Sequence, residues 1–135
     1  MQRRNFIAAS AITIAAMAVP SWAWTEGKRT MFGLISKMMT VPGKRDELMT
    51  ILLSGVDKMP GCLSYIVAAD ENDANAIWVT EVWETKASHD ESLSLPSVKE
   101  AIAKGRPLIA GFGERFVTAP AGGHGLVRPN VPTPS

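Results

Sequence analysis

The stretch EVWETKASHDESLSLP, residues 81–96, contains His89, one of only two histidines in the chain. It follows an apolar segment that ends at Trp83. An imidazole titrates close to neutral pH, so His89 is a candidate base for a phenolic proton at the mouth of a pocket. The alternative is a solvated helix position beside Asp90 and Glu91, where neighbouring carboxylates favour the charged ring.

A second candidate base is Glu81, which stands between Val79 and Trp83 on an apolar strand face. A carboxylate in such surroundings needs a partner, because burying it without one is costly. Its functional role would be to act as a base or to orient one. The alternative is a structural salt bridge to Lys37 or Arg115, which is favoured because ion pairs without a catalytic role also perturb pKa values.

Three aromatic side chains, Trp83, Tyr65 and Phe32, are candidate walls for a flat aromatic substrate. Strand aromatics more often belong to the core or to a dimer interface, although in a barrel the inner core is also the pocket wall. Trp78 lies on the opposite face of its strand from Trp83, and we expect it to pack against the helices.

These residues need a scaffold, and the spacing of apolar residues and turn signals predicts one. Apolar runs predict four strands, and apolar residues at helical spacing predict three helical segments between them. The order is β-α-β-β-α-β, a ferredoxin-like antiparallel sheet of the α+β class with helices on one face. The predicted strands are 31–41, 62–69, 76–84 and 108–118, and the predicted helices are 44–59, 86–94 and one from Pro96 to about Gly105.

The sheet face away from the helices should be polar in a monomer. Whichever face of each strand points away from the helices, however, it carries large apolar residues. A second sheet or a ligand must then cover it. A homodimer packed sheet on sheet would supply the cover and enclose one apolar cavity in each subunit, which predicts a dimeric α+β barrel.

Residues 1–23 have the three-part pattern of an export signal: a basic start with Arg3-Arg4, an uncharged run, and small residues before a cut after Ala23. The arginine pair fits a twin-arginine signal. We therefore expect a periplasmic or secreted protein without stable membrane association after processing. An uncleaved anchor is the alternative, but the apolar run is short for a span.

The rest of the chain is divided into a domain at 31–118 and a tail at 119–135 rich in proline and glycine. Once Arg3 and Arg4 are removed, 12 basic residues face 13 acidic ones, a net charge of −1 that gives no basic patch for nucleic acid. Cys62 is the only cysteine, so no intrachain disulfide can form. One cysteine and two distant histidines also predict no metal site.

With this order of elements, three short motifs make the chain resemble the antibiotic biosynthesis monooxygenase family. They are Pro60-Gly61-Cys62, Glu81-Val82-Trp83-Glu84 and Ala87-Ser88-His89, and the resemblance covers 31–118. The family consists of small dimeric α+β-barrel proteins that include quinol and anthrone oxygenases. The resemblance implies a monooxygenase that uses dioxygen on a small quinol or polycyclic phenol without metal, flavin or haem as cofactor.

The chain has the residues that such a reaction needs: His89, with Glu81, would take the proton, and Trp83, Tyr65 and Phe32 would hold the ring. The histidines of many quinol-oxidising relatives are replaced here by Ser92 and Ser97. Haem-degrading relatives pair an asparagine on the first strand with a later histidine; residues 31–41 contain no asparagine and 90–118 no histidine, which disfavours that role. Two alternatives remain, a non-enzymatic dimeric binding protein for a hydrophobic small molecule and, less favoured, a haem-binding relative.

Overall fold

The computed structural model describes residues 30–56 and 58–126, so the predicted export signal and the last part of the tail lie outside the described residues. Its centre is one antiparallel sheet with the strand order β2-β3-β1-β4. This order and the alternation of strands and helices confirm the predicted ferredoxin-like fold. The strands are β1 (Phe32–Thr40), β2 (Cys62–Ala69), β3 (Ala76–Trp83) and β4 (Ile109–Thr118).

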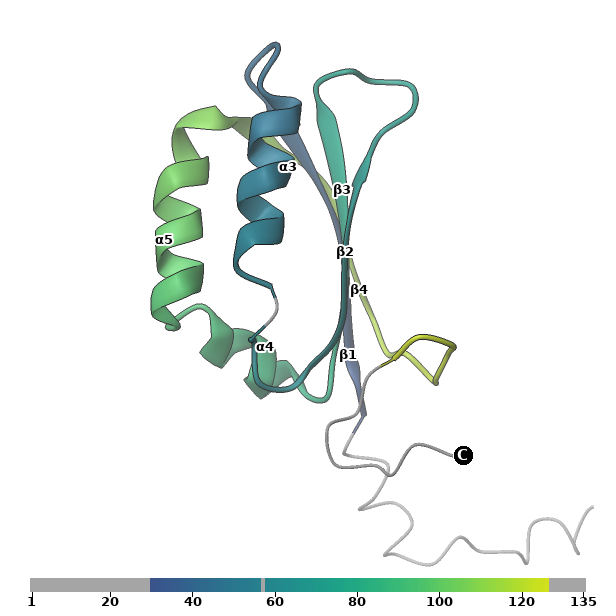
Figure 1. The fold of residues 1–135 in the computed structure, drawn as a ribbon. Helices are drawn as coiled ribbons and strands as arrows, with labels where there is room; N and C mark the ends of the chain where they lie inside the picture. Colours follow the sequence, from purple (N-terminus) through teal and green to yellow (C-terminus); the bar gives the residue numbers. More distant parts are fainter. Residues whose placement is uncertain (1–29, 57, 127–135) are drawn as a thin grey trace, which may run out of the picture.

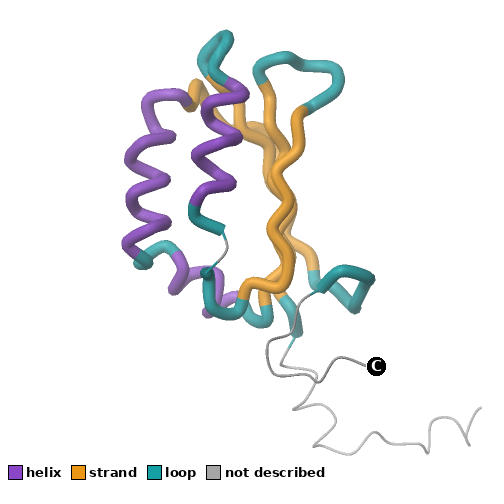
Figure 2. The backbone as a smooth tube through the Cα atoms, in the orientation of Figure 1, coloured by secondary structure: helices purple, strands orange, loops and turns teal. Residues whose placement is uncertain are grey.

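All helices lie on the same face of the sheet (Figures 1 and 2). They are α3 (Arg45–Ser54), α4 (Lys86–Ser92) and α5 (Pro96–Gly105), followed by the 3-10 turn η1 (Arg106–Leu108). The two longer helices stand side by side against the sheet, and α4 lies at one end of it (Figure 1). Within the described ranges, no helix is long and apolar enough to cross a membrane.

Helix ends differ from the prediction where glycine and capping chemistry intervene. The first helix was predicted to run from 44 to 59, but α3 stops at Ser54 with Gly55 as its C-cap. Glycine is a poor helix former, so the chain leaves the helix there although apolar residues continue. The cap of α4 is Thr85, whose Oγ1 accepts a hydrogen bond from the backbone N of Ser88 at 3.0 Å.

The apolar core of the fold consists of two clusters. Leu48 of α3 is fully buried against Ile77 and Val79 of β3. Near the other end of the sheet, Phe32 packs with Leu34 and Trp83, while Cys62 contacts this cluster and is half-buried. The contact of Leu48 with Ile77 and Val79 shows that the helices cover this face of β3, the face that also carries Trp83.

The expectation that Trp78 packs against the helices was wrong. Because Ile77 and Val79 point to the helices, strand alternation directs Trp78 to the opposite face. There its Nε1 donates to Asp70 Oδ2 at 2.8 Å, and Lys37 Nζ lies 5.5 Å from its ring centre. Alternation could not reveal this choice, since both faces of the strand carry bulky apolar residues.

The sheet leaves large apolar side chains exposed on its uncovered side. Ile66 and Phe116 point away from the helices, and their side chains are 55% and 52% exposed. On the helix side of edge strand β4, Phe112 and Val117 lie beyond the cover of the helices and are 72% and 59% exposed. The uncovered face of the sheet and the edge strand β4 are therefore apolar, whereas a monomer of this size usually shows polar residues at its surface.

Candidate active site

A cavity of about 580 Å³ lies between the helices and the sheet. Most of its wall is apolar and comes from α3, α5 and the covered face of the sheet. It is accessible to solvent, since three of its lining residues, Leu93, Ile102 and Phe112, are also exposed. Its ionisable lining residues are Tyr65, Glu81, His89 and Arg106.

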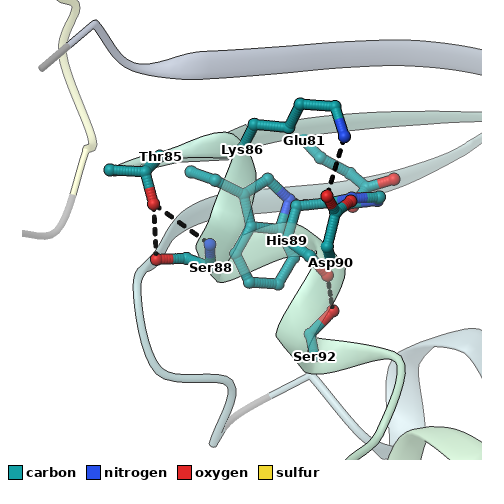
Figure 3. A network of polar contacts seen from close by, with 8 residues as sticks. Glu81, Thr85, Lys86, Ser88, His89, Asp90 and Ser92 are labelled. Carbon is teal, nitrogen blue, oxygen red and sulfur yellow. Dashed lines mark hydrogen bonds and ion pairs between the residues drawn. The ribbon is translucent and has the colours of Figure 1, made fainter. Parts of the chain in front are cut away.

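His89 points into this cavity. Its ring centre lies 5.5 Å from that of Trp83 in an edge-to-face arrangement and 5.2 Å from that of Phe32. Only 14% of its side chain is exposed. Its Nδ1 is 3.0 Å from Asp90 Oδ1, and among the described residues none hydrogen-bonds to Nε2 (Figure 3). The ring therefore lines the cavity, as the first alternative expected, and its contact with Asp90 is the one that the second alternative expected.

Close packing of α4 against the turn before β2 orients the helix that carries His89. Gly61, at the turn before β2, has a φ of +83°, and a Cβ built on it would lie 2.5 Å from Ser88 Oγ. Only glycine lets the chain turn there and lets α4 approach so closely. On the same helix, Ser92 Oγ donates to the carbonyl of His89 at 2.6 Å, which satisfies a group near the helix end. The Pro-Gly-Cys motif thus helps to position the helix that carries His89.

Among the described residues, a tryptophan and not an ion partner holds Glu81. Trp83 Nε1 donates to its Oε1 at 2.9 Å. The expected salt bridge was wrong: Lys37 lies on the other face, 3.9 Å from Asp70, and Arg115 contributes only a longer-range attraction. Burial raises the pKa of the Glu81 carboxyl, and the hydrogen bond from Trp83 and the charges of His89 and Arg115 partly offset that rise.

Tyr65 neighbours Glu81 across the β2–β3 pair and lines the same cavity. Burial raises the pKa of its phenol well above the ordinary range, and the charges of Glu81 and Cys62 add to the rise. The phenol therefore stays protonated and can donate a hydrogen bond. Trp83 lines the cavity while being almost fully buried. Phe32, expected to be a wall of the cavity, is not among its lining residues; its ring packs against that of His89 and belongs to the cluster of Leu34 and Trp83.

Two features of the site go beyond the site residues assigned from the sequence. Arg106 lines the cavity, and the Asp90 carboxylate, expected only to favour the charged form of His89, hydrogen-bonds its ring. The second could have been suspected from Lys86, four residues before Asp90, because such spacing forms ion pairs on helices. Within residues 30–56 and 58–126, no group of three or more potential ligands is arranged to hold a metal ion.

Solved structures of several proteins share this architecture. The chain is 58% identical to one from Chloroflexus aurantiacus J-10-fl, named as an antibiotic biosynthesis monooxygenase, over 73% of this chain and 100% of that one, with a TM-score of 0.71. Similarly named structures from Bacteroides thetaiotaomicron and Caulobacter crescentus are 15% and 20% identical, with TM-scores of 0.63 and 0.58. The former covers 76% of this chain and 100% of that one, the latter 67% and 88%, and both show the fold alone.

No match was found among curated proteins. The family model for antibiotic biosynthesis monooxygenases matches residues 31–104, which span β1 to the last turn of α5 and include every ionisable residue of the cavity except Arg106. Together with the identity to the Chloroflexus protein, this match shows that the chain belongs to the antibiotic biosynthesis monooxygenase family.

Proposed function

We propose that this protein is an exported, cofactor-independent monooxygenase that oxidises a small quinol or polycyclic phenol with dioxygen. One observation carries the proposal: His89 and Glu81, a base and a second ionisable group, open onto the same apolar cavity. A protein that only bound a hydrophobic molecule would need apolar walls alone. Here a nearly buried imidazole has its Nε2 free of partners among the described residues.

In the proposed reaction the substrate supplies all the electrons. His89 Nε2 takes the proton of a substrate hydroxyl, so the O–H bond breaks and an N–H bond forms. The electron-rich anion then reduces dioxygen. One oxygen atom enters the ring and the other leaves as water, so that a quinol and dioxygen give a hydroxyquinone and water. This balance needs no further reductant.

The remaining lining residues suit a flat, weakly acidic substrate. A volume of about 580 Å³ is within the range of small-molecule sites and holds a fused ring system. The Trp83 and Tyr65 rings can contact the substrate face, and the protonated Tyr65 hydroxyl can donate to a developing phenolate. In an apolar enclosure the imidazolium and the phenolate attract each other more strongly than in water.

We also propose that the working unit is a homodimer. Support comes from the exposed apolar side chains on the uncovered side of the sheet and along β4, among them Phe112 and Phe116. Light scattering of the purified protein should give twice the mass of the processed chain. Phe116→Asp should lower that mass toward the monomer, while Leu53→Asp, which changes an exposed apolar residue on α3, should not.

Export is part of the proposal because of the pattern in residues 1–23. Mass spectrometry of protein from the periplasm or medium should find a chain that starts at Trp24. Replacement of Arg3 and Arg4 by lysine should keep the protein in the cytoplasm if the twin-arginine route is used. Continued export of that variant would refute the route.

The central test is oxygen uptake by the processed protein with a panel of quinols and polycyclic phenols. His89→Ala should lower the rate about 10²- to 10⁴-fold, the usual range for loss of a general base. The matched control is His124→Ala, since His124 is exposed and does not line the cavity. Equal rates for both variants and the wild type would remove His89 from the mechanism.

The same panel, together with a haem titration, distinguishes the competing functions. Tight binding of the phenols without any oxygen uptake would favour the binding protein. A Soret band on haem titration that decays under a reductant would favour the haem-degrading alternative. Oxygen uptake that depends on His89 would support the oxygenase.

A further inference from the structure

The exposed side of α4 carries a short chain of polar contacts that ends on the cavity base. Lys86 Nζ lies 2.7 Å from Asp90 Oδ2, and Asp90 Oδ1 lies 3.0 Å from His89 Nδ1 (Figure 3). Each carboxylate oxygen of Asp90 therefore serves a different partner. The carboxylate bridges a lysine in solvent and a ring that faces the cavity.

His89 separates two environments. Its ring packs against Phe32 and Trp83 with 14% of its side chain exposed, whereas the Asp90 side chain is 51% exposed. The contact at Nδ1 is on the solvent side of the ring. Because a neutral imidazole carries one N–H, an acceptor at Nδ1 places the hydrogen there and makes Nε2 the basic nitrogen.

We propose that Asp90 is the positioning residue of His89: it accepts the Nδ1–H, fixes the tautomer in which Nε2 is the base, and stabilises the imidazolium formed during turnover. The inference rests on the proposed function for its proton step. The substrate O–H breaks, Nε2–H forms, and the positive ring then lies against the Asp90 carboxylate. The same proton is later delivered to the oxygen atom that leaves as water.

Lys86 completes the arrangement by holding Asp90. Of the charged groups around the ring, Glu81 from β3 accepts a hydrogen bond from Trp83 Nε1, and among the described residues no hydrogen bond joins it to His89. Asp90 is thus the one carboxylate that hydrogen-bonds the ring among the described residues. The Lys86 ammonium, and after it the hydrogen bond from His89, lower the pKa of the Asp90 carboxyl, which keeps it ionised in its role as acceptor.

The first arm of the test does not depend on activity. Nitrogen NMR of the imidazole in substrate-free protein at pH 8, where an ordinary histidine is neutral, reports which ring nitrogen carries hydrogen. The wild type should show His89 mainly as the Nδ1–H tautomer. In Asp90→Asn that preference should be lost, because the amide can donate to Nδ1. An unchanged tautomer in Asp90→Asn would overturn the proposal.

The second arm measures oxygen uptake. Asp90→Asn should lower kcat about 10-fold with little change in KM, at the low end for a charge-assisted hydrogen bond because Asp90 is half exposed. Asp90→Glu should recover part of the loss, and Lys86→Met should cost about 2-fold. The matched control is Lys104→Met, which breaks a similar exposed pair, Lys104 with Glu100 at 2.9 Å on α5, and should change neither tautomer nor rate.

The two arms keep this inference distinct from the proposed function. If the wild type takes up no oxygen with any substrate, the proposed function fails and the proton step with it, and the NMR arm alone decides whether Asp90 sets the tautomer. If oxygen is taken up and Asp90→Asn is as fast as the wild type, the positioning role in catalysis is refuted. Circular dichroism of every variant checks that α4 remains folded.

Discussion

The hydrogen bond from Trp83 to Glu81 offers a direct test of how the site is held together. Trp83 Nε1, 2.9 Å from Oε1, is the one donor that the described residues give to this carboxylate. Trp83→Phe keeps an aromatic ring in the cluster but leaves the carboxylate buried without that donor. We therefore expect a loss of stability beyond the loss of packing.

The magnitude follows from the charge of the acceptor. A hydrogen bond to an ionised group contributes about 1.5–3 kcal/mol, or roughly 10- to 150-fold in the unfolding equilibrium. A double-mutant cycle with Glu81→Leu separates this contribution from packing, because the double variant has no stranded carboxylate. At pH 7 the cycle should give a coupling of about 1.5–3 kcal/mol between Trp83 and Glu81.

The coupling should weaken in acid. Once Glu81 is protonated, the bond becomes a neutral one of about 1 kcal/mol. Because burial raises the pKa of Glu81, this change should begin above its ordinary value of about 4.3 as the pH falls. Urea unfolding at a fixed protomer concentration supplies the four free energies of unfolding. A coupling below about 0.5 kcal/mol at pH 7, or one equal at pH 7 and pH 3.5, would refute the reasoning.

Three further predictions concern the same region. Gly61→Ala should destabilise the fold by more than the matched Gly43→Ala. Both glycines have a left-handed φ, which costs about 1–2 kcal/mol with a side chain, but only at Gly61 would the added Cβ meet another atom, Ser88 Oγ at 2.5 Å. Equal unfolding midpoints for the two variants would contradict this. Burial raises the pKa of Cys62 to about 11 from 9.0, so at pH 8 it should react with iodoacetamide about 100-fold more slowly than a free thiol, and an equal rate would show that the thiol is not shielded. Burial raises the pKa of Glu81 in the folded state, so ionisation of this group costs stability. The free energy of unfolding of the wild type relative to Glu81→Gln should therefore be greatest below about pH 4.3 and fall as the pH rises. The opposite slope in urea titrations would refute a raised pKa for Glu81.

Some parts of the site were accessible from residue types alone. The need of a carboxylate for a partner on an apolar strand face identified Glu81 as unusual, and proximity in the chain linked His89 with Trp83. The partner of Glu81 was not accessible. Trp83 is two residues along the same strand face, so its reach to Glu81 depends on a side-chain rotamer that packing under α4 selects.

The sequence by itself determined the order of elements and the family. Proline and glycine positions mark where strands and helices end, and two-residue alternation keeps Tyr65 and Glu81 on definite faces of their strands. These are local rules, because each depends on backbone geometry within a few residues. They were sufficient for the four strands, the helices on one side of the sheet and the Glu-x-Trp pattern of the third strand.

Only the tertiary structure decided direction. Both faces of β3 carry bulky apolar residues, so its periodicity could not tell whether Trp83 or Trp78 meets the helices. The rotation of α4 about its axis was equally open, because successive residues on a helix point about 100° apart and any of several could face the sheet. Contact of Ser88 with Gly61 sets that rotation, turns the His89 ring toward Trp83, and leaves Asp90 outside to hold it.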